Sequence, residues 1–330
     1  MVKHPIGEAN ESSLFGSLTE DEFYDRHSVS HSTEFFTNSR GLRQYTQWWL
    51  PKPPTKPIAL ITVLHGFTGE ANWFITLTST FLAESGFAVC AIDFEGHGLS
   101  EGLEYYIPDI NLIVDDCIEF FDLFREKHAP GLPAFLYAES LGGAIALYIT
   151  FRQKGAWDGL VLTSSLIGIS RKSYPPWPME HVLSLAAWLL PTWLGVPTRG
   201  TDPNLSFKEE WKQKLAEARP RRLKVAKLRL GTARELLRLC KELQGRFEEV
   251  EVPLLIVHGE EDLSCDPECV KALYNRASSE DKTIRMYPGM FHQIVGEPQE
   301  SVDMVFGGVV EWIKTRALRA SHAEEGGNGN

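Results

Sequence analysis

The sequence has few cysteines and no uninterrupted apolar stretch of membrane-spanning length. Its five cysteines are an odd number, scattered over 330 residues with no C-x-x-C pair, which argues against a disulfide framework and a zinc site. The most apolar stretch, residues 177–196, contains Glu180, His181 and Pro191, whereas a spanning helix needs about 20 apolar residues. We therefore expect neither a disulfide-rich domain nor a membrane-spanning helix.

Positive charge is also scarce. The 33 Lys and Arg residues against 44 Asp and Glu residues leave a net charge of −11, which argues against general nucleic-acid binding, because a polyanion needs a cationic surface. Residues 1–13 lack the apolar core of a secretory signal, so we expect a cytoplasmic protein. With 43% hydrophobic and 23% charged residues, the composition is that of an ordinary globular protein.

Short apolar segments alternate with segments of helical periodicity along most of the chain. Such alternation indicates an α/β fold in which a mostly parallel central sheet is flanked by helices. The expected strands are 34–38, 42–50, 58–64, 87–92, 134–137, 159–162, 253–257 and 283–287. The expected helices are 72–85, 109–128, 141–152, 267–277 and 300–318.

The alternation stops between residues 166 and 243, where Pro- and Trp-rich pieces precede helical, basic sequence. We expect one core, formed by residues 31–165 and 244–319, that is interrupted by this insertion. Residues 1–30 are mostly polar, and we expect them to be loosely ordered. The tail at 320–330 is also expected to be disordered.

A serine lies at the junction between an expected strand and the next expected helix, in the segment YAESLGG. Such a turn can hold Ser140 in a strained backbone conformation with its hydroxyl exposed above the sheet. The segment resembles G-x-S-x-G, with Ala138 at the first glycine, and Gly142 allows the close approach of strand and helix. The N–H of Leu141, at the helix start, would point toward a developing oxyanion. The alternative is a Gly-rich helix start capped by an ordinary serine.

A nucleophilic serine needs a neighbouring base that is oriented by a carboxylate. In folds of this type the acid and then the base follow the serine along the chain. Asp262, in HGEEDLSCDP, and His292, in YPGMFHQIVGE, each follow an expected strand. Because parallel strands build their sites at their carboxyl ends, we expect Ser140, Asp262 and His292 to meet there as nucleophile, acid and base.

Each of these residues also has a simpler interpretation. Asp262 belongs to an acidic cluster that a solvated turn would explain, and His292 could be an ordinary surface-loop histidine. His258, four residues before Asp262, is the competing base, although it lies within an expected strand and before the acid.

The loop HGFTG, after the expected strand 58–64, is the candidate source of a second oxyanion donor. Gly66 allows a sharp bend, and the N–H of Phe67 is our candidate. His65 is expected to pin the loop by hydrogen bonding. The loop lacks the Lys-Ser/Thr of a phosphate-binding P-loop. The predicted reaction is attack on an acyl carbonyl followed by hydrolysis of the acyl-enzyme, and it needs no metal and no organic cofactor.

Several blocks of this sequence together resemble the monoacylglycerol lipase group of α/β-hydrolases, and especially its plant members, which include caffeoylshikimate esterases. The resemblance runs from about residue 18 to residue 318. The blocks are LTEDEFYDRHSVSHSTEFFTNSRGLRQYTQWWLP, LHGFTG, IDFEGHGLSEGL, AESLGGAIAL, VPLLIVHGEEDLSCDP, KALYNRASSEDKTIRMYPGMFH and VVEWI. The resemblance implies the α/β-hydrolase fold with an inserted helical lid at 166–243, and the same triad and oxyanion donors.

The lid sequence is rich in tryptophan and leucine. We expect Trp177, Trp188, Leu189 and Trp193 to contribute to an acyl pocket, although simple packing onto the core would explain some of them. The same surface could dock transiently on a membrane or lipid droplet, which would make the protein peripheral. Residues 219–241 carry nine basic residues and one acidic residue, a local excess that could face anionic headgroups or could simply be solvated.

The leading functional hypothesis is a serine carboxylester hydrolase for monoacylglycerols or related lysolipids. An esterase for hydroxycinnamoyl esters of the caffeoylshikimate type competes within the same class. In either case the partner is a small-molecule acyl ester. A different class, a non-hydrolytic ligand-binding protein on the same fold, remains an alternative because a fold does not determine a function.

Overall fold

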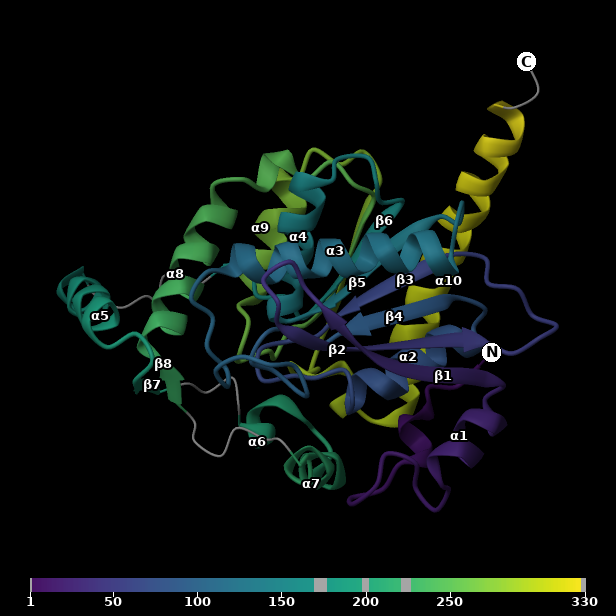
Figure 1. The fold of residues 1–330 in the computed structure, drawn as a ribbon, viewed down its shortest axis with the longest axis horizontal. Coiled ribbons are helices and arrows are strands. Elements are labelled where there is room, and N and C mark those ends of the chain that lie inside the picture. The colour runs from purple at the N-terminus through teal and green to yellow at the C-terminus, as the bar shows by residue number, and fades with distance from the viewer. Residues whose placement is uncertain (1, 169–176, 198–201, 221–226, 328–330) are drawn as a thin grey trace.

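A mixed sheet of eight strands forms the centre of the molecule (Figure 1). The computed structural model describes residues 2–168, 177–197, 202–220 and 227–327. The strand order is β1-β2-β4-β3-β5-β6-β9-β10. The strands are β1 (Val29–Thr37), β2 (Arg43–Pro51), β3 (Leu60–Leu64), β4 (Ala88–Ile92), β5 (Ala134–Glu139), β6 (Gly159–Thr163), β9 (Leu254–Gly259) and β10 (Lys282–Tyr287). Strand β2 pairs antiparallel with β1 and β4, and the other neighbouring strands are parallel.

Helices cover both faces of this sheet, which confirms the predicted fold class. The core helices are α2 (Phe74–Glu84), α3 (Ile110–His128), α4 (Leu141–Arg152), α9 (Pro267–Arg276) and α10 (Gln299–Gly327). Helices α3, α4 and α9 share one hydrophobic cluster, and α2 and α10 share the other. Buried strand residues alternate between the clusters: Leu60 and Leu64 of β3 face the first, Ile61 and Val63 the second.

The observed elements agree with the expected ones apart from shifts at their ends. The helix predicted over 141–152 begins and ends at those residues. Helix α3 begins where predicted because the Asp109 side chain caps it, accepting from the N–H of Asn111. Helix α10 continues to residue 327, beyond the expected end of the core, and residues 328–330 of the expected tail lie outside the described part.

The N-terminal segment differs from the expectation of a loosely ordered tail. It forms a 3-10 turn, η1 (Pro5–Glu8), and a helix, α1 (Glu20–Arg26), that begins with a capping box between Thr19 and Glu22. Ile6 and Phe23 are fully buried in the cluster shared with α2 and α10. The N-terminal segment is therefore anchored by single apolar residues within polar sequence. Because these residues do not recur with helical or strand periodicity, the sequence did not predict that the segment is ordered.

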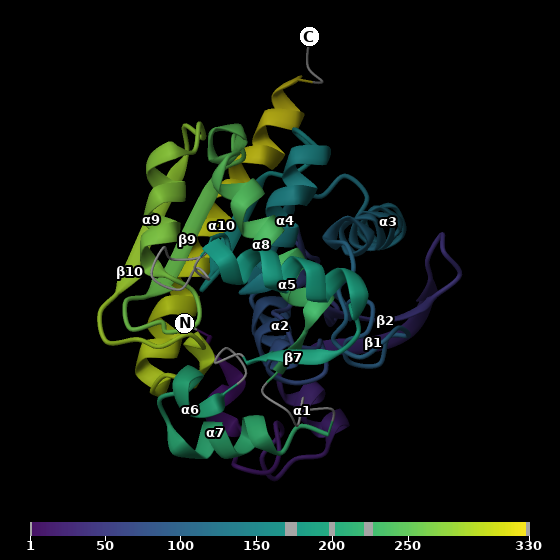
Figure 2. The same ribbon diagram turned by 90° about the vertical axis from the view of Figure 1, so that its left-hand side faces the viewer.

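The insertion between β6 and β9 forms a separate layer over the carboxyl ends of the central strands (Figure 2). Its elements are α5 (Trp177–Leu189), β7 (Leu194–Pro197), α6 (Pro203–Ser206), α7 (Glu210–Glu217), β8 (Lys227–Arg229) and α8 (Leu230–Gln244), and the 3-10 turn η2 (Phe247–Glu249) follows it. Strands β7 and β8 form a small antiparallel sheet. Helix α8 returns to the core through Leu236, Leu239 and Leu243. Among the described residues, no helix combines the length and apolarity that crossing a membrane requires.

Candidate active site

Ser140 occupies a sharp turn between β5 and α4. Its backbone has φ +52° and ψ −119°, a conformation that is unfavourable for a residue with a side chain. Three backbone hydrogen bonds hold it. The Ser140 N–H donates to the Thr163 carbonyl at 3.1 Å, and the Ser140 carbonyl accepts from the N–H groups of Gly143 and Leu166 at 3.0 and 2.8 Å. The turn is therefore fixed by the neighbouring strand and by the start of the insertion.

The turn also depends on close backbone approaches at two glycines. A Cβ on Gly142 would lie 2.3 Å from the Leu64 carbonyl oxygen, and one on Gly66 would lie 2.9 Å from the Ser140 Cβ. Ala138, at the position of the first motif glycine, is fully buried in the core, so its methyl group fits. The loop after β3 thus lies directly against Ser140, as the sequence predicts.

Asp262 and His292 form a buried pair. The His292 Nδ1 and the Asp262 Oδ2 are 2.8 Å apart, and the other carboxylate oxygen accepts from the N–H groups of Ser264 and Cys265 at 2.8 and 2.9 Å. Burial alone would raise the pKa of Asp262, but the His292 imidazole and these donors hold it below its usual value. A charged carboxylate on Nδ1–H leaves the His292 Nε2 as a proton acceptor.

His258, the competing base, lies behind this pair. Its side chain is fully buried, and its Nε2 lies 3.4 Å from Asp262 Oδ2 and 3.2 Å from the Cys265 carbonyl oxygen. Burial lowers the pKa of His258. Among the described residues that line the cavity described next, Ser140 and His292 are present and His258 is not. From this position His258 can help to hold the Asp262 carboxylate in place, but it does not face the cavity.

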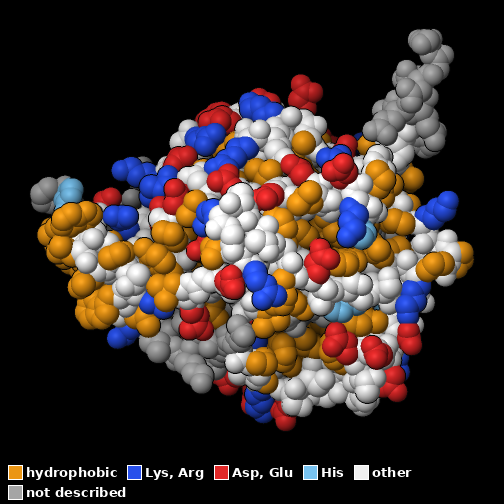
Figure 3. Space-filling model, in the orientation of Figure 1, with side chains coloured by type: hydrophobic (Ala, Val, Ile, Leu, Met, Phe, Trp, Pro, Cys, Tyr) orange, Lys and Arg blue, Asp and Glu red, His pale blue; other side chains and the backbone are white. Residues whose placement is uncertain are grey.

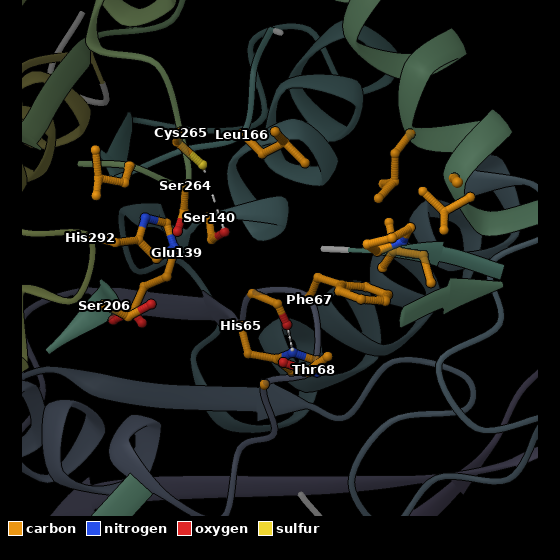
Figure 4. A pocket seen from close by; sticks show the side chains of 18 of the residues that line it. His65, Phe67, Thr68, Glu139, Ser140, Leu166, Ser206, Ser264, Cys265 and His292 are labelled. Atoms are coloured by element: carbon orange, nitrogen blue, oxygen red, sulfur yellow. Dashed lines mark hydrogen bonds between the residues drawn. The ribbon is translucent and has the colours of Figure 1, made fainter. Parts of the chain in front are cut away.

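Ser140 and His292 open into a cavity of about 910 Å³ between the sheet and the insertion. Figure 4 shows the Ser140 hydroxyl, the Cys265 thiol and the His292 imidazole gathered at one end of it, with the Phe67 ring across from them. The walls contributed by the insertion are mainly apolar: Met179, Val182, Leu183, Ala186, Val196, Leu228, Leu230, Leu236 and Leu237. Cavities of about 300–1,000 Å³ with such walls bind small organic ligands.

The loop after β3, the predicted source of an oxyanion donor, is held in place by His65. His65 accepts from the Phe94 N–H at 3.1 Å, stacks on the Phe94 ring and bonds the Gly66 carbonyl at 2.8 Å. Burial lowers the pKa of His65 well below its usual value, so it pins the loop as a neutral ring. Within the part of the chain that is described, the N–H groups of Phe67 and Leu141 donate no hydrogen bond to the protein. Both donors are available.

Glu139 adds a second carboxyl group beside the serine. It lines the cavity together with His292, and its Oε1 accepts from the Tyr137 hydroxyl at 2.9 Å. Burial raises the pKa of Glu139 above its usual value, although the Tyr137 hydrogen bond and the nearby His292 oppose this.

The predicted pocket residues of the insertion lie elsewhere. Trp188, Leu189 and Trp193 are 71%, 59% and 62% exposed, and none of them lines the described cavity. Helical phase explains this for Trp188 and Leu189: the cavity is lined by residues 179, 182, 183 and 186 of α5, and 185, 188 and 189 lie on the other side of the helix. Met179 and Val182 are nevertheless 55% and 60% exposed, so the cavity-lining side of α5 is itself open to solvent. Trp177 is the first residue of α5, but its side chain lies outside the described part of the structure.

Two charged residues in the cavity wall were not predicted. Arg219 Nε lies 3.5 Å from Glu70 Oε1, and both side chains are at least four-fifths buried. Glu70 directly follows the HGFTG loop, so its proximity to the site could have been inferred from the sequence. Arg219, by contrast, lies two residues after α7 and outside every motif that the sequence analysis identified.

The rest of the basic segment is partly paired. Arg238 bonds Glu235 and Glu242 along α8, and Arg229 donates to the carbonyl groups of Glu104 and Thr192. Arg221, Arg222 and Lys224 lie outside the described residues.

Asp262, Cys265 and His292 place potential metal ligands within 4.8 Å of one another. The Cys265 Sγ lies 4.0 Å from the Ser140 Oγ, and burial raises the pKa of this thiol well above its usual value. A neutral thiol is a weak metal ligand, and the His292 Nδ1 already bonds Asp262. The donor set therefore fits a proton relay better than a metal centre.

Comparisons with known proteins agree with this architecture. Residues 55–299 match the Hydrolase_4 family, described as serine aminopeptidase, S33. The chain is 31% identical to the caffeoylshikimate esterase of Arabidopsis thaliana over 93% of this chain and 92% of that protein. It is 29% identical to the human monoglyceride lipase over 87% of this chain and 91% of that one.

Among solved structures, a soluble variant of the monoglyceride lipase from Saccharomyces cerevisiae has a TM-score of 0.75 at 19% identity. The superposition covers 86% of this chain and 95% of the yeast lipase chain. This likeness supports the fold, and the family match extends over most of the chain. The protein therefore belongs to the Hydrolase_4 family of α/β-hydrolases and is an ester hydrolase.

Proposed function

We propose that the protein hydrolyses carboxylic esters with Ser140 as nucleophile, His292 as base and Asp262 as the acid that orients the base. The observation that carries the proposal is the strained Ser140 turn, which opens into the same cavity as the His292–Asp262 pair. In this mechanism Ser140 Oγ attacks the acyl carbonyl while His292 Nε2 takes its proton.

The remaining steps follow from the same groups. The N–H groups of Phe67 and Leu141 stabilise the oxyanion of the tetrahedral intermediate. His292 then passes the proton to the leaving alcohol, which leaves an acyl ester on Ser140. Water, deprotonated by His292, attacks this ester and releases the carboxylic acid, and the proton returns to Ser140.

We propose a monoacylglycerol or related lysolipid as the substrate. The support is the large apolar wall that the insertion contributes, which suits an acyl chain, and the similarity to monoglyceride lipases. In this proposal the insertion acts as a lid over the acyl chain.

A hydroxycinnamoyl ester of the caffeoylshikimate type is the second candidate. The Arg219–Glu70 pair favours it, because a charged pair in the cavity wall offers both donors and acceptors to a polar alcohol. The 31% identity to the Arabidopsis caffeoylshikimate esterase points the same way.

A fluorophosphonate probe tests the proposal. We expect the wild type to be labelled at Ser140 and the Ser140→Ala and His292→Ala variants to remain unlabelled. The same three proteins are assayed on a glycerol monoester and on a hydroxycinnamoyl ester. Absence of label on the wild type would overturn the proposed mechanism, and turnover of the aromatic ester alone would reverse the order of the two substrates.

We further propose that the insertion docks on lipid surfaces. Its outer α5 patch, defined here as Leu185, Trp188 and Leu189 on α5 together with Leu190 and Trp193 just after it, is 54–71% exposed. Figure 3 shows hydrophobic side chains gathered at the tip of the molecule where α5 lies. Solvent-exposed tryptophan and leucine on one helix face are typical of interfacial binding.

Flotation with phospholipid vesicles tests this docking. We expect wild type to float with vesicles and a Trp188→Ala/Trp193→Ala double variant to stay in the soluble fraction. Leu123→Ala is the matched control, since Leu123 on α3 is 51% exposed but lies outside the patch. Equal flotation of all three proteins would contradict the proposal.

A further inference from the structure

The loop between β10 and α10, which carries the candidate base, is held by a segment of the insertion. The Gln293 N–H donates to the Ser206 carbonyl at 2.9 Å. The N–H groups of Lys208 and Glu209 share the Gly296 carbonyl at 3.2 Å. The end of α6 and the start of α7 are therefore bonded to the loop on both flanks of its short 3-10 turn, η3 (Ile294–Gly296).

Two lysines of this segment reach into the same loop. The Lys212 side chain is fully buried, and its Nζ donates to the Glu297 carbonyl and lies 3.0 Å from the Glu209 carboxylate. The Lys208 Nζ donates to the Gly289 carbonyl at 2.8 Å and lies 3.7 Å from Glu297 Oε2. Burying an ammonium group is costly, so a fully buried lysine needs strong partners.

Glu297 transmits this contact toward the base. Its carboxylate is 1% exposed, and Oε1 accepts from the Phe291 N–H at 2.7 Å. Phe291 directly precedes His292. Glu297 thus links Lys212 on α7, which bonds its backbone carbonyl, to the backbone of the residue beside the base, which bonds its carboxylate.

We infer that Lys212 and Glu297 are positioning residues for His292, an inference that rests on the proposed function. Lys212 holds the Glu297 backbone, and the Glu297 carboxylate holds the loop at Phe291. Displacing reacting groups by about 1 Å costs on the order of 100-fold in rate. The same α6–α7 segment lines the cavity through Ser206 and Phe207, so the wall that meets substrate and the support of the base are one unit.

Two pairs of variants test this inference. Lys212→Met removes the buried ammonium group and is compared with Lys214→Met on the same helix, where the lysine is 53% exposed and forms surface ion pairs. Glu297→Leu removes the acceptor for the Phe291 N–H, whereas Glu297→Gln keeps an oxygen at that position. The readouts are kcat and KM on a soluble short-chain ester, the rate of Ser140 labelling by a fluorophosphonate, and the melting temperature.

We expect Lys212→Met and Glu297→Leu to lower kcat and the labelling rate at least tenfold with KM changed less than threefold. Glu297→Gln and Lys214→Met should remain within threefold of wild type. Hydrogen exchange of residues 288–298 should accelerate in the first two variants at temperatures where they are folded. Wild-type rates in folded Lys212→Met and Glu297→Leu would overturn the inference while leaving the Ser140 mechanism intact. Failure of wild type to label would instead overturn the proposed function.

Discussion

At Ser140 the backbone pays about 1–3 kcal/mol for a positive φ in a residue with a side chain. Its N–H and carbonyl group are fully hydrogen-bonded to Thr163, Gly143 and Leu166, so the surrounding backbone enforces this conformation. Among the described residues, the hydroxyl has a single hydrogen-bonding contact, with the Cys265 sulfur at 4.0 Å. The rigid backbone therefore presents a side chain that is free to react.

In the proposed mechanism the Asp262 carboxylate has a role that an amide cannot replace. In Asp262→Asn the side chain keeps its shape but loses the charge that fixes Nδ1–H on His292. We expect kcat for ester hydrolysis to fall about 1,000- to 10,000-fold. Steady-state kinetics on a soluble ester measure it, with a far-ultraviolet dichroism spectrum to establish folding. A fall of less than tenfold would contradict the role of Asp262.

Glu139 makes the stability of the protein depend on pH. Because burial raises its pKa, the folded state favours the protonated form, and this contribution is lost as pH rises from 4.5, its ordinary pKa, through the raised value. We expect Glu139→Gln to be more stable than wild type at pH 8 and equal to it at pH 4. Thermal melts of both proteins at the two pH values measure this difference. The opposite pH trend would show that Glu139 is stabilised as a carboxylate.

At the scale of elements, helix α5 has apolar residues on two faces with different environments. Residues 179, 182, 183 and 186 line the cavity, whereas 185, 188 and 189 face outward. The helix packs against α8, which anchors it to the core. One element can therefore contribute both to the acyl site and to a surface for lipid.

Charged substitutions on the two faces of α5 should separate these contributions. Leu183→Asp places a carboxylate in the cavity, and we expect KM for a long-chain ester to rise at least tenfold with little change for an acetyl ester. Leu185 lies one half-turn away and is 60% exposed. We expect Leu185→Asp to leave KM unchanged for both the long-chain ester and the acetyl ester, measured without detergent. Equal effects of the two variants would contradict the assigned helix phase.

At the scale of the whole molecule, the sheet and its helices were predictable because each carries a regular pattern. Strand β3 is a continuous apolar run buried on both faces, and α3 shows helical spacing with an Asp109 cap. The positions of the candidate residues Ser140, Asp262 and His292 at the carboxyl ends of parallel strands were predictable, because each follows an apolar strand segment in the sequence.

Other features depend on contacts that no local pattern reveals. The exposure of Trp188 depends on how α5 packs on α8, and both faces of α5 are apolar in sequence. From the sequence alone, Lys212 would be expected on the surface, because it lies in a charged helical segment. Its full burial comes from contact with the loop that carries Glu297, eighty-five positions away. The order of the first thirty residues likewise comes from distant partners.

The N-terminal segment should contribute to global stability. Ile6 is fully buried in the cluster shared with α2 and α10, and truncating a buried isoleucine to alanine costs about 2–5 kcal/mol. We therefore expect Ile6→Ala to lower the melting temperature by several degrees while leaving kcat at 25 °C within twofold. The exposed Lys3→Ala is the control. An unchanged melting temperature for Ile6→Ala would show that the segment is detached in solution.

The contact between the two ends of the chain has a consequence for biosynthesis. The His4 N–H donates to the Asp303 carboxylate at 2.8 Å, and the Gln299 amide donates to the His4 carbonyl at 2.9 Å, so these partners are almost a full chain length apart in sequence. While a ribosome is still extending the polypeptide, the first residues have only part of their docking site, because α2 has been made and α10 has not. The leading segment can therefore complete its contacts only after α10 has emerged from the ribosome.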